Sequence, residues 1–254
     1  MKDYMNFTGR VAIVTGAGSK RGIGFAAARI MAGYGATVII ADIDEAGGSE
    51  NALQICTETG RDNAAYFVKV DLTSEDSIKA MTATVLEKCG KIDILVNNAG
   101  ISVPNAYTDI SLAEWNKVLT INLTSAFLCC REIIPHMQAQ KYGRVINVAS
   151  VSGKNGGVLG GCHYTTTKGG MISMAKCIAK QVALDGVTVN CVAPGTVKTD
   201  GAGVPWEQKK PSESPMKRRA ETDEIAFAIV YLASEIASYN TGSTVDVNGG
   251  LYMD

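Results

Sequence analysis

Tyr164 and Lys168 stand four residues apart in the stretch GCHYTTTKGG, residues 161–170. On a helix, side chains at positions i and i+4 share one face and lie roughly 5–6 Å apart. A neighbouring cation favours the phenolate and lowers the pKa of a tyrosine from its ordinary value of about 10. Such a tyrosine can exchange a proton with a substrate near neutral pH. The same pair also occurs by chance on helices with no chemical role, so the rest of the chain has to decide between the two interpretations.

Composition excludes several classes of protein. The chain has 254 residues, 46% of them hydrophobic, and a formal net charge of −1 at pH 7, so no global charge attracts nucleic acid or an anionic membrane. Seven scattered cysteines without a CxxC motif, and only two histidines, predict reduced thiols and no metal site. The start of the chain lacks the apolar core of a signal peptide, and no apolar run approaches 18 residues. We therefore expect a cytoplasmic protein without a membrane segment.

Seven short, almost continuously apolar runs are expected to form strands. Such runs are typical of strands that are buried on both faces of a parallel sheet. Their ranges are 10–16, 36–42, 64–71, 92–100, 143–150, 187–195 and 243–250. Segments of helix length separate them, and this alternation predicts right-handed βαβ units. We expect one domain over residues 1–254, a Rossmann-like, doubly wound α/β fold with a seven-stranded parallel sheet and helices on both faces.

Start and stop signals mark some of the intervening helices. Ser74 and Gly90 predict the N-cap and the C-terminal stop of one helix. Ser111 and Glu114 have the spacing of a capping box at the start of a long helix over 111–137.

The stretch 198–215 fits the alternating pattern least. It is polar, holds three prolines and lacks helical periodicity. A loop of this length in a compact domain is usually functional, and we expect a substrate lid there.

The stretch TGAGSKRGIG, residues 15–24, follows the first predicted strand and opens a helical segment. Glycines in such a turn let backbone amides approach a pyrophosphate at the helix N-terminus. Asp42 ends the second predicted strand, where a carboxylate can accept hydrogen bonds from the adenosine ribose and repel a 2′-phosphate. Lys20 and Arg21 lie in the loop and argue the other way, because they could pair with a 2′-phosphate. On balance NAD is expected, and NADP is the less favoured cofactor.

With these residues in place, the chain resembles the short-chain dehydrogenase/reductase family over nearly its whole length. The matching motifs occur in the family's order: TGAGSKRGIG, with two extra residues between Gly16 and Gly22; VDL with Asp71; NNAG (97–100); Asn122 in INLTSAF; Ser150 in INVAS; the Tyr164 and Lys168 pair; PGTVKT (194–199); and TGSTVDVNGG (241–250).

The resemblance implies a catalytic tetrad. Tyr164 would be the general acid in reduction and the general base in oxidation, and Lys168 would lower its pKa and bind the nicotinamide ribose. Ser150 would stabilise charge on the substrate oxygen, and Asn122 would hold a water that links Lys168 to solvent. Ser152 is the alternative candidate for the catalytic hydroxyl.

The resemblance also implies a set of cofactor contacts. They are Gly16, Ser19, Arg21, Gly22, Ile23, Gly24, Asp42, Ile43, Asp71, Leu72, Asn98, Ala99, Gly100, Tyr164, Lys168, Pro194, Gly195, Val197 and Thr199.

The implied activity is interconversion of a secondary alcohol and a ketone by hydride transfer with NAD(P), in a homotetramer with a small-molecule substrate. We expect a polyol, sugar derivative, hydroxysteroid or hydroxy acid. The ending is similar to 3-oxoacyl-acyl-carrier-protein reductases, which are the alternative. These typically use NADPH and favour a basic residue where this chain has Asp185, and both features argue against them. A catalytically idle nucleotide-binding scaffold is more remote. Cys162 and His163, directly before Tyr164, are candidates to line the pocket.

Overall fold

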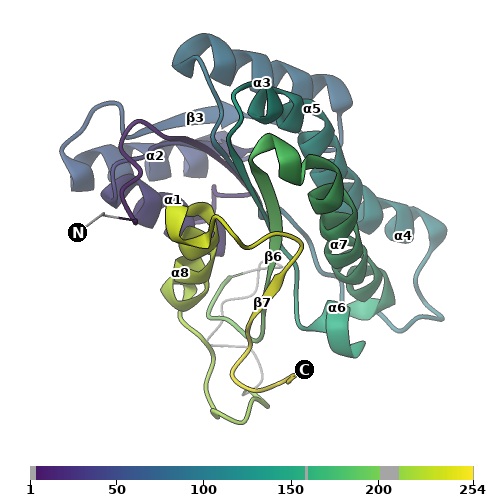
Figure 1. Ribbon diagram of the computed structural model, residues 1–254. Helices are drawn as coiled ribbons and strands as arrows, with labels where there is room; N and C mark the ends of the chain where they lie inside the picture. Colours follow the sequence, from purple (N-terminus) through teal and green to yellow (C-terminus); the bar gives the residue numbers. More distant parts are fainter. Residues whose placement is uncertain (1–3, 158–159, 201–211, 254) are drawn as a thin grey trace.

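The computed structural model describes residues 4–157, 160–200 and 212–253 (Figure 1). Residues 201–211, which form most of the predicted lid, lie outside the described residues.

A seven-stranded parallel sheet forms the centre of the molecule, in the order β3-β2-β1-β4-β5-β6-β7. All seven predicted strands are present, and the predicted doubly wound α/β fold is confirmed. The bounds of the strands are β1 Val11–Thr15, β2 Thr37–Asp42, β3 Ala65–Lys69, β4 Ile94–Asn97, β5 Gly143–Val148, β6 Val187–Pro194 and β7 Thr244–Val247. Strands β1, β5 and β6 are buried along their whole length, because helices cover both faces of the sheet.

Two hydrophobic clusters lie against opposite faces of the sheet. The first is formed with α1 (Ile23–Gly33), α2 (Glu45–Thr59) and α8 (Thr222–Ala233). The second is formed with α3 (Glu75–Cys89), α5 (Ser125–Ala139) and α7 (Gly161–Val182). Strand order reverses between β1 and β4, and in doubly wound sheets this is where a crevice opens at the carboxyl ends of the strands.

The predicted helix signals are largely confirmed. Ser74 caps α3 by accepting a hydrogen bond from the Ser77 amide, and Gly90 ends that helix in the left-handed conformation. Ser111 caps α4 (Leu112–Leu119) by accepting from the Glu114 amide. The predicted capping box is only half formed, however. The Glu114 carboxylate forms hydrogen bonds with Asn105 and His163 instead of with the backbone amide of Ser111.

The long helix expected over 111–137 is interrupted. It consists of α4, a π-helical turn at Thr120–Thr124 and α5. The span Leu112–Ala139 is long and apolar enough to cross a membrane by length and composition, and 44% of its apolar window is buried inside the fold. Its buried side chains, among them Cys129 and Ile133, belong to the cluster that packs on the sheet.

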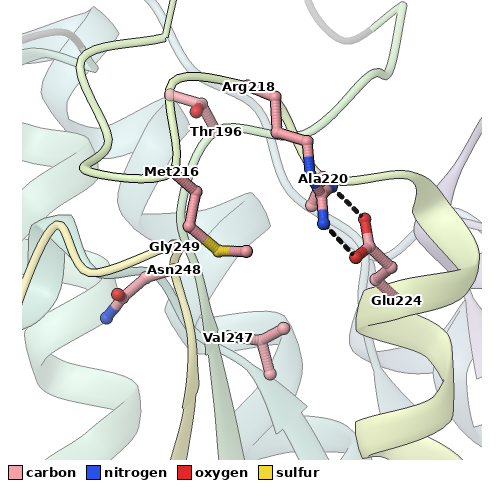
Figure 2. A pocket seen from close by; sticks show the side chains of 8 residues that line it. All are labelled: Thr196, Met216, Arg218, Ala220, Glu224, Val247, Asn248 and Gly249. Carbon is pink, nitrogen blue, oxygen red and sulfur yellow. Dashed lines mark hydrogen bonds and ion pairs between the residues drawn. The ribbon is translucent and has the colours of Figure 1, made fainter.

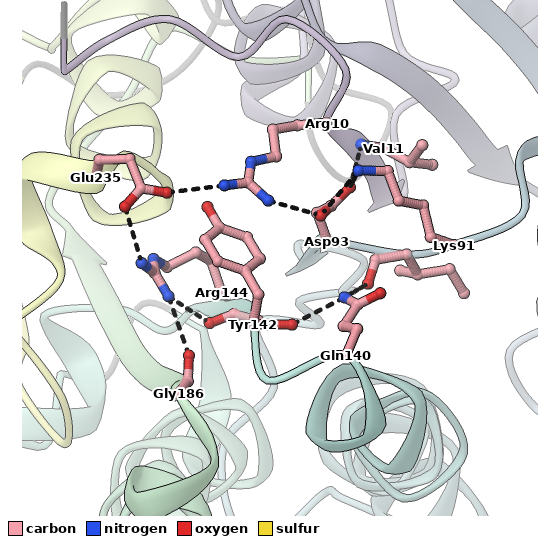
Figure 3. Close-up of polar contacts among 11 residues, drawn as sticks. Arg10, Val11, Lys91, Asp93, Gln140, Tyr142, Arg144, Gly186 and Glu235 are labelled. Carbon is pink, nitrogen blue, oxygen red and sulfur yellow. Dashed lines mark hydrogen bonds and ion pairs between the residues drawn. The ribbon is translucent and has the colours of Figure 1, made fainter.

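A charged network ties the amino ends of the strands together (Figure 3). Arg10 donates to Asp93 and to Glu235, at 3.0 Å in each case. Arg10 and Arg144 both lie over the ring of Tyr142, at 3.5 and 4.4 Å from its centroid. Burial raises the pKa of Tyr142 to about 12, so the phenol stays neutral. The network connects the ends of the strands that lie opposite the crevice.

Candidate active site

A cavity of about 520 Å³ opens at the carboxyl ends of the strands on both sides of the β1–β4 reversal. Most of the predicted cofactor residues line it. The lining consists of Gly16, Ser19, Gly22, Ile23, Asp42, Ile43, Asp44, Val70, Asp71, Leu72, Thr73, Asn98, Ala99, Gly100, Ile101, Ile121 and Thr199.

The glycines after β1 are required by close contacts. Gly16 has φ +66°, and a Cβ on it would lie 2.6 Å from the Ala99 Cα. A Cβ on Gly24 would lie 2.5 Å from the side-chain amide nitrogen of Asn98. The N-cap of α1 is Gly22, which offers no side-chain acceptor, and the first turn carries no acid. The amides at this helix start are therefore left to an external anion such as a pyrophosphate.

Asn98 and Thr15 fix the floor of the cavity. The side-chain amide of Asn98 donates to the backbone carbonyls of Thr15 and Gly16, at 2.9 Å each. The Thr15 hydroxyl in turn accepts from the backbone amides of Asn98 and Ala99, at 3.1 and 3.2 Å. The loop is rigid because each of these backbone groups has a partner.

Asn51 is a supporting residue that the sequence interpretation missed. It is 1% exposed on α2 and donates to the carbonyls of Ala17 and Gly18, at 2.9 Å each. Its signal in the sequence was weak, since a single asparagine on a helix has no motif around it.

Asp42 lines the cavity beside the glycine-rich loop. One carboxylate oxygen accepts from the Gly18 amide at 2.7 Å, and the other accepts from the Asp44 amide at 3.0 Å. A Cβ on Gly18 would lie 2.9 Å from this carboxylate, so Asp42 and the glycine-rich loop fit closely together. The site is acidic, because Asp44 lines the same cavity.

The basic residues near the loop face acids. Lys20 pairs with Glu50 at 2.8 Å, and the Arg21 guanidinium lies 3.7 Å from the Asp200 carboxylate. Each of these two basic side chains thus has an acidic partner, which bears on the choice between NAD and NADP.

Three residues of the predicted tetrad, Ser150, Tyr164 and Lys168, lie near Gly100, which lines the cavity, although none of the three is in the lining itself. The Ser150 side chain acts to lower the pKa of the Tyr164 phenol, and the Lys168 ammonium lies 5.6 Å from the centroid of the Tyr164 ring. Ser150 is thus the serine at the tyrosine, whereas Ser152, the alternative, donates its backbone amide to the Ser150 hydroxyl at 3.1 Å. Gly100 joins this group to the cavity, since a Cβ on it would lie 3.5 Å from the Lys168 ammonium.

Burial changes the acidity of both members of the Tyr164 and Lys168 pair. Lys168 is 3% exposed, its ammonium donates to the Val148 carbonyl at 2.7 Å, and burial lowers its pKa to about 8. Burial raises the pKa of Tyr164, against a smaller lowering by the hydrogen bond with Ser150. The sequence predicted a lowered tyrosine pKa. The direction is the reverse in this structure, because removing the phenolate from water outweighs its stabilising contacts.

Asn122 lies in the π-helical turn and is fully buried. Its carbonyl accepts from the Ile101 amide at 2.8 Å, while its amide donates to the Ile101 carbonyl at 2.9 Å and to the Thr167 hydroxyl at 3.2 Å. Asn122 thereby connects Ile101, which lines the cavity, to Thr167 on α7. Its role in holding a water stays a prediction.

The predicted cofactor residues that are not in the lining of the cavity are Arg21, Gly24, Tyr164, Lys168, Pro194, Gly195 and Val197. Pro194 ends β6, and its carbonyl accepts from the Val151 amide at 2.9 Å, beside Ser150. Gly195 donates to the Val247 carbonyl at 3.0 Å, and Val197 forms an isolated bridge with Ala220.

A second, smaller cavity of about 90 Å³ was not predicted from the sequence. It adjoins the PGTVKT segment through Thr196, and an ion pair between Arg218 and Glu224 lies at its edge (Figure 2). The two residues before Tyr164 do not line either cavity: Cys162 is exposed to solvent, and His163 is buried against Glu114.

Comparisons with known proteins agree with this geometry. The family model described as enoyl-(acyl carrier protein) reductase matches residues 16–252. The 3-oxoacyl-acyl-carrier-protein reductase FabG of Aquifex aeolicus is 40% identical, over 96% of this chain and 98% of that protein. FabG of Escherichia coli is 37% identical, over 98% of this chain and 100% of that protein.

Among solved structures, one described as a short-chain dehydrogenase/reductase from Burkholderia xenovorans superposes with a TM-score of 0.90. It is 32% identical and covers 99% of this chain and 100% of its own. The family model and the full-length relatives lead to one conclusion: the chain belongs to the short-chain dehydrogenase/reductase family, whose members are nicotinamide-dependent oxidoreductases.

Proposed function

We propose that the protein interconverts a ketone and a secondary alcohol with NAD(H). The observation that carries this proposal is the meeting of Ser150, Tyr164 and Lys168 beside Gly100, which lines the same cavity as the glycine-rich loop and Asp42. The residues present fit a dinucleotide, since glycines leave room for a pyrophosphate and the cavity reaches from Asp42 to Gly100.

A bound nicotinamide supplies or accepts the hydride. The chain's own residues handle the proton and the charge. The phenol of Tyr164 donates its proton to the carbonyl oxygen during reduction and takes it back during oxidation. The Ser150 hydroxyl, which also acts to lower the pKa of that phenol, stabilises negative charge on the same oxygen. Lys168 supplies positive charge behind the tyrosine while it is protonated.

The preference for NAD rests on the charges around Asp42. A 2′-phosphate would enter a site that already holds the carboxylates of Asp42 and Asp44. Lys20 and Arg21, the residues that could favour NADP, lie against Glu50 and Asp200. Like charges in one site destabilise each other, so these contacts favour a free ribose hydroxyl.

For the substrate, the relatives favour a 3-oxoacyl thioester over the predicted polyol, sugar derivative, hydroxysteroid or hydroxy acid. Two FabG proteins match this chain over nearly their full length. We therefore take reduction of a 3-oxoacyl thioester as the first candidate.

A non-acyl secondary alcohol remains as the second candidate because of one ion pair. The Lys141 ammonium bonds the Asp185 carboxylate at 2.6 Å, and this contact holds the pKa of Asp185 below its ordinary value. Asp185 thus neutralises a cation on the surface where an acidic carrier protein would need one.

The test follows reduced nicotinamide by absorbance. Purified protein is given NADH or NADPH with 3-oxoacyl thioesters of coenzyme A and of acyl carrier protein, and NAD or NADP with a panel of secondary alcohols. We expect turnover with NADH and a thioester. Turnover confined to alcohols supports the second candidate, and cofactor binding without any turnover supports an idle scaffold.

Tyr164→Phe is the matched variant, because it removes a single hydroxyl from a buried ring. Loss of the general acid is expected to lower kcat on the order of 10²–10⁴-fold while leaving cofactor affinity nearly unchanged. Full activity of Tyr164→Phe would refute the assignment of the proton donor.

We also propose that the protein is a homotetramer. Large apolar side chains are exposed on α4 and α5, including Leu112 at 74% and Phe127 at 45%. Light scattering on the eluting protein would give its mass, and a monomer would overturn this proposal.

A further inference from the structure

His163, the residue directly before Tyr164, lies outside the predicted tetrad and has 0% exposed surface. Both nitrogens of its ring have partners. Nδ1 lies 2.9 Å from the Tyr164 backbone nitrogen, and Nε2 lies 2.9 Å from a carboxylate oxygen of Glu114. The ring therefore stands between the start of α7, which carries the tyrosine, and α4, which runs beside it in Figure 1.

The partners determine which nitrogen carries the proton. A backbone amide can only donate, so Nδ1 must be the acceptor of the Tyr164 N–H bond. In a neutral imidazole the other nitrogen is then protonated, and Nε2–H donates to the Glu114 carboxylate. Both contacts are satisfied together only by this tautomer. A doubly protonated ring would set two donors against each other at Nδ1.

The imidazole of His163 offers an acceptor to the Tyr164 amide at the start of α7. The N-cap of α7 is Gly160, which provides no side-chain cap, and Tyr164 is the fourth residue of the helix, whose amide is the first that can bond a carbonyl within it. Here this amide donates to the His163 Nδ1 at 2.9 Å. The imidazole supplies an acceptor to the residue whose side chain performs the proposed proton transfer.

Surrounding contacts leave the ring little freedom. Gly161 has φ +78°, and a Cβ on it would lie 2.6 Å from the His163 Cε1 and 2.7 Å from the Val103 carbonyl. Asn105 donates to both carboxylate oxygens of Glu114, at 3.0 and 2.9 Å. Because Glu114 bonds both Asn105 and His163, its carboxylate does not complete the predicted capping box of α4.

We propose that His163 is a positioning residue for Tyr164. In its Nε2–H form it anchors the Tyr164 backbone through Nδ1 and the α4 carboxylate Glu114 through Nε2, and so fixes the phenol at the substrate end of the cavity. This inference rests on the proposed role of Tyr164 as proton donor.

Two variants separate the two halves of the contact. His163→Asn places an acceptor oxygen near the position of Nδ1, and His163→Gln places an amide nitrogen near the position of Nε2. If anchoring of the Tyr164 amide is what matters, Asn should keep kcat within about threefold, whereas Gln should lower it about 10-fold or more, as for a slightly misplaced reacting group. The affinity for NADH, measured by fluorescence, should stay unchanged in both. The control is His136→Gln, which alters an exposed histidine on α5.

Equal loss of kcat in the Asn and Gln variants, or no loss in either, would overturn the proposal, since a purely structural role does not distinguish the two nitrogens. Nitrogen-detected NMR supplies a readout that needs no substrate. The chain has two histidines, so the His136→Gln spectrum identifies the His163 signals. An unprotonated Nδ1 with a protonated Nε2 is expected, and any other state overturns the proposal. If the wild-type protein turns over no substrate, the proposed function fails and the tautomer alone decides whether the contact exists.

Discussion

Replacing Lys168 by Met is expected to stabilise the protein at neutral pH while it removes a proposed catalytic group. Lys168 is 3% exposed, and burial lowers its pKa from 10.5 to about 8. The folded chain therefore holds a charge that would be better solvated in the unfolded chain. Methionine fills a similar volume without a charge.

The magnitude follows from the pKa. One pKa unit equals about 1.4 kcal/mol, so the drop from 10.5 to about 8 corresponds to a destabilisation of roughly 3 kcal/mol at pH 7. Lys168→Met relieves this penalty. It also leaves the Val148 carbonyl without its 2.7 Å donor, which costs on the order of 1–3 kcal/mol. The net stabilisation at pH 7 is therefore about 0–2 kcal/mol, which corresponds to a rise in Tm of up to roughly 8 °C.

The pH dependence isolates the charge. Between about pH 8 and pH 10.5 the unfolded chain holds a proton on Lys168 that the folded chain has released, so the stability of the wild type gains from this group as pH rises. Below pH 8 the penalty is constant. The advantage of Lys168→Met should therefore shrink by roughly 2 kcal/mol between pH 8 and pH 9.5. The loss of the Val148 contact does not depend on pH in the variant and cancels in this comparison.

The assay is denaturant unfolding at fixed protein concentration in a series of buffers from pH 6.5 to about 9.5, a window that spans the folded pKa. The control is Lys180→Met, an exposed lysine on the same helix, for which a change within about 0.5 kcal/mol is expected at every pH. A difference between wild type and Lys168→Met that does not vary with pH would refute the reasoning, because the lysine would then keep its ordinary pKa in the fold.

Three further predictions concern the cavity. Asp42→Asn should weaken NADH binding by roughly 10-fold or more and raise the affinity for NADPH, as measured by fluorescence titration. The control is Asp44→Asn, which removes one negative charge from the same cavity. An unchanged preference in Asp42→Asn would contradict the role of Asp42. Gly16→Ala should abolish cofactor binding or folding, because its Cβ would lie 2.6 Å from the Ala99 Cα at φ +66°, and calorimetry would detect either loss. Ser150→Ala should lower kcat about 10²-fold with little change in KM for the cofactor; a variant as active as wild type would show that another donor stabilises the substrate oxygen.

The strands and some helix ends could be predicted because their signals are local. A strand buried on both faces must be apolar along its length, and the apolar runs located all seven strands, although β3 and β7 are only partly buried. Ser74 and Gly90 predicted the ends of α3 because capping depends on one side chain or on one left-handed glycine. Glu114 shows the limit of this reasoning: its spacing suited a capping box, yet His163, 49 residues away, takes its carboxylate instead.

In the candidate site, too, some features could be predicted from the sequence and others could not. Sequence alone indicated which residue types do the chemistry, since Tyr164, Lys168, Ser150 and the glycine-rich turn occur in the order of a known family. It did not determine their acidity. The expected lowering of the Tyr164 pKa considered one neighbouring cation, whereas the pKa depends on how much water the whole fold removes from the phenol.

The supporting residues came from the tertiary structure. Asn51 is an ordinary helix residue until α2 packs beside the glycine-rich loop, and His163 is one of two histidines until α4 brings Glu114 against it. Apolar periodicity and turn chemistry act over a few neighbours, so the sequence determined the order of elements and the family. Burial and hydrogen-bond partners across distant segments exist only once the chain is folded, so the charge states and the orientation of the site were decided there.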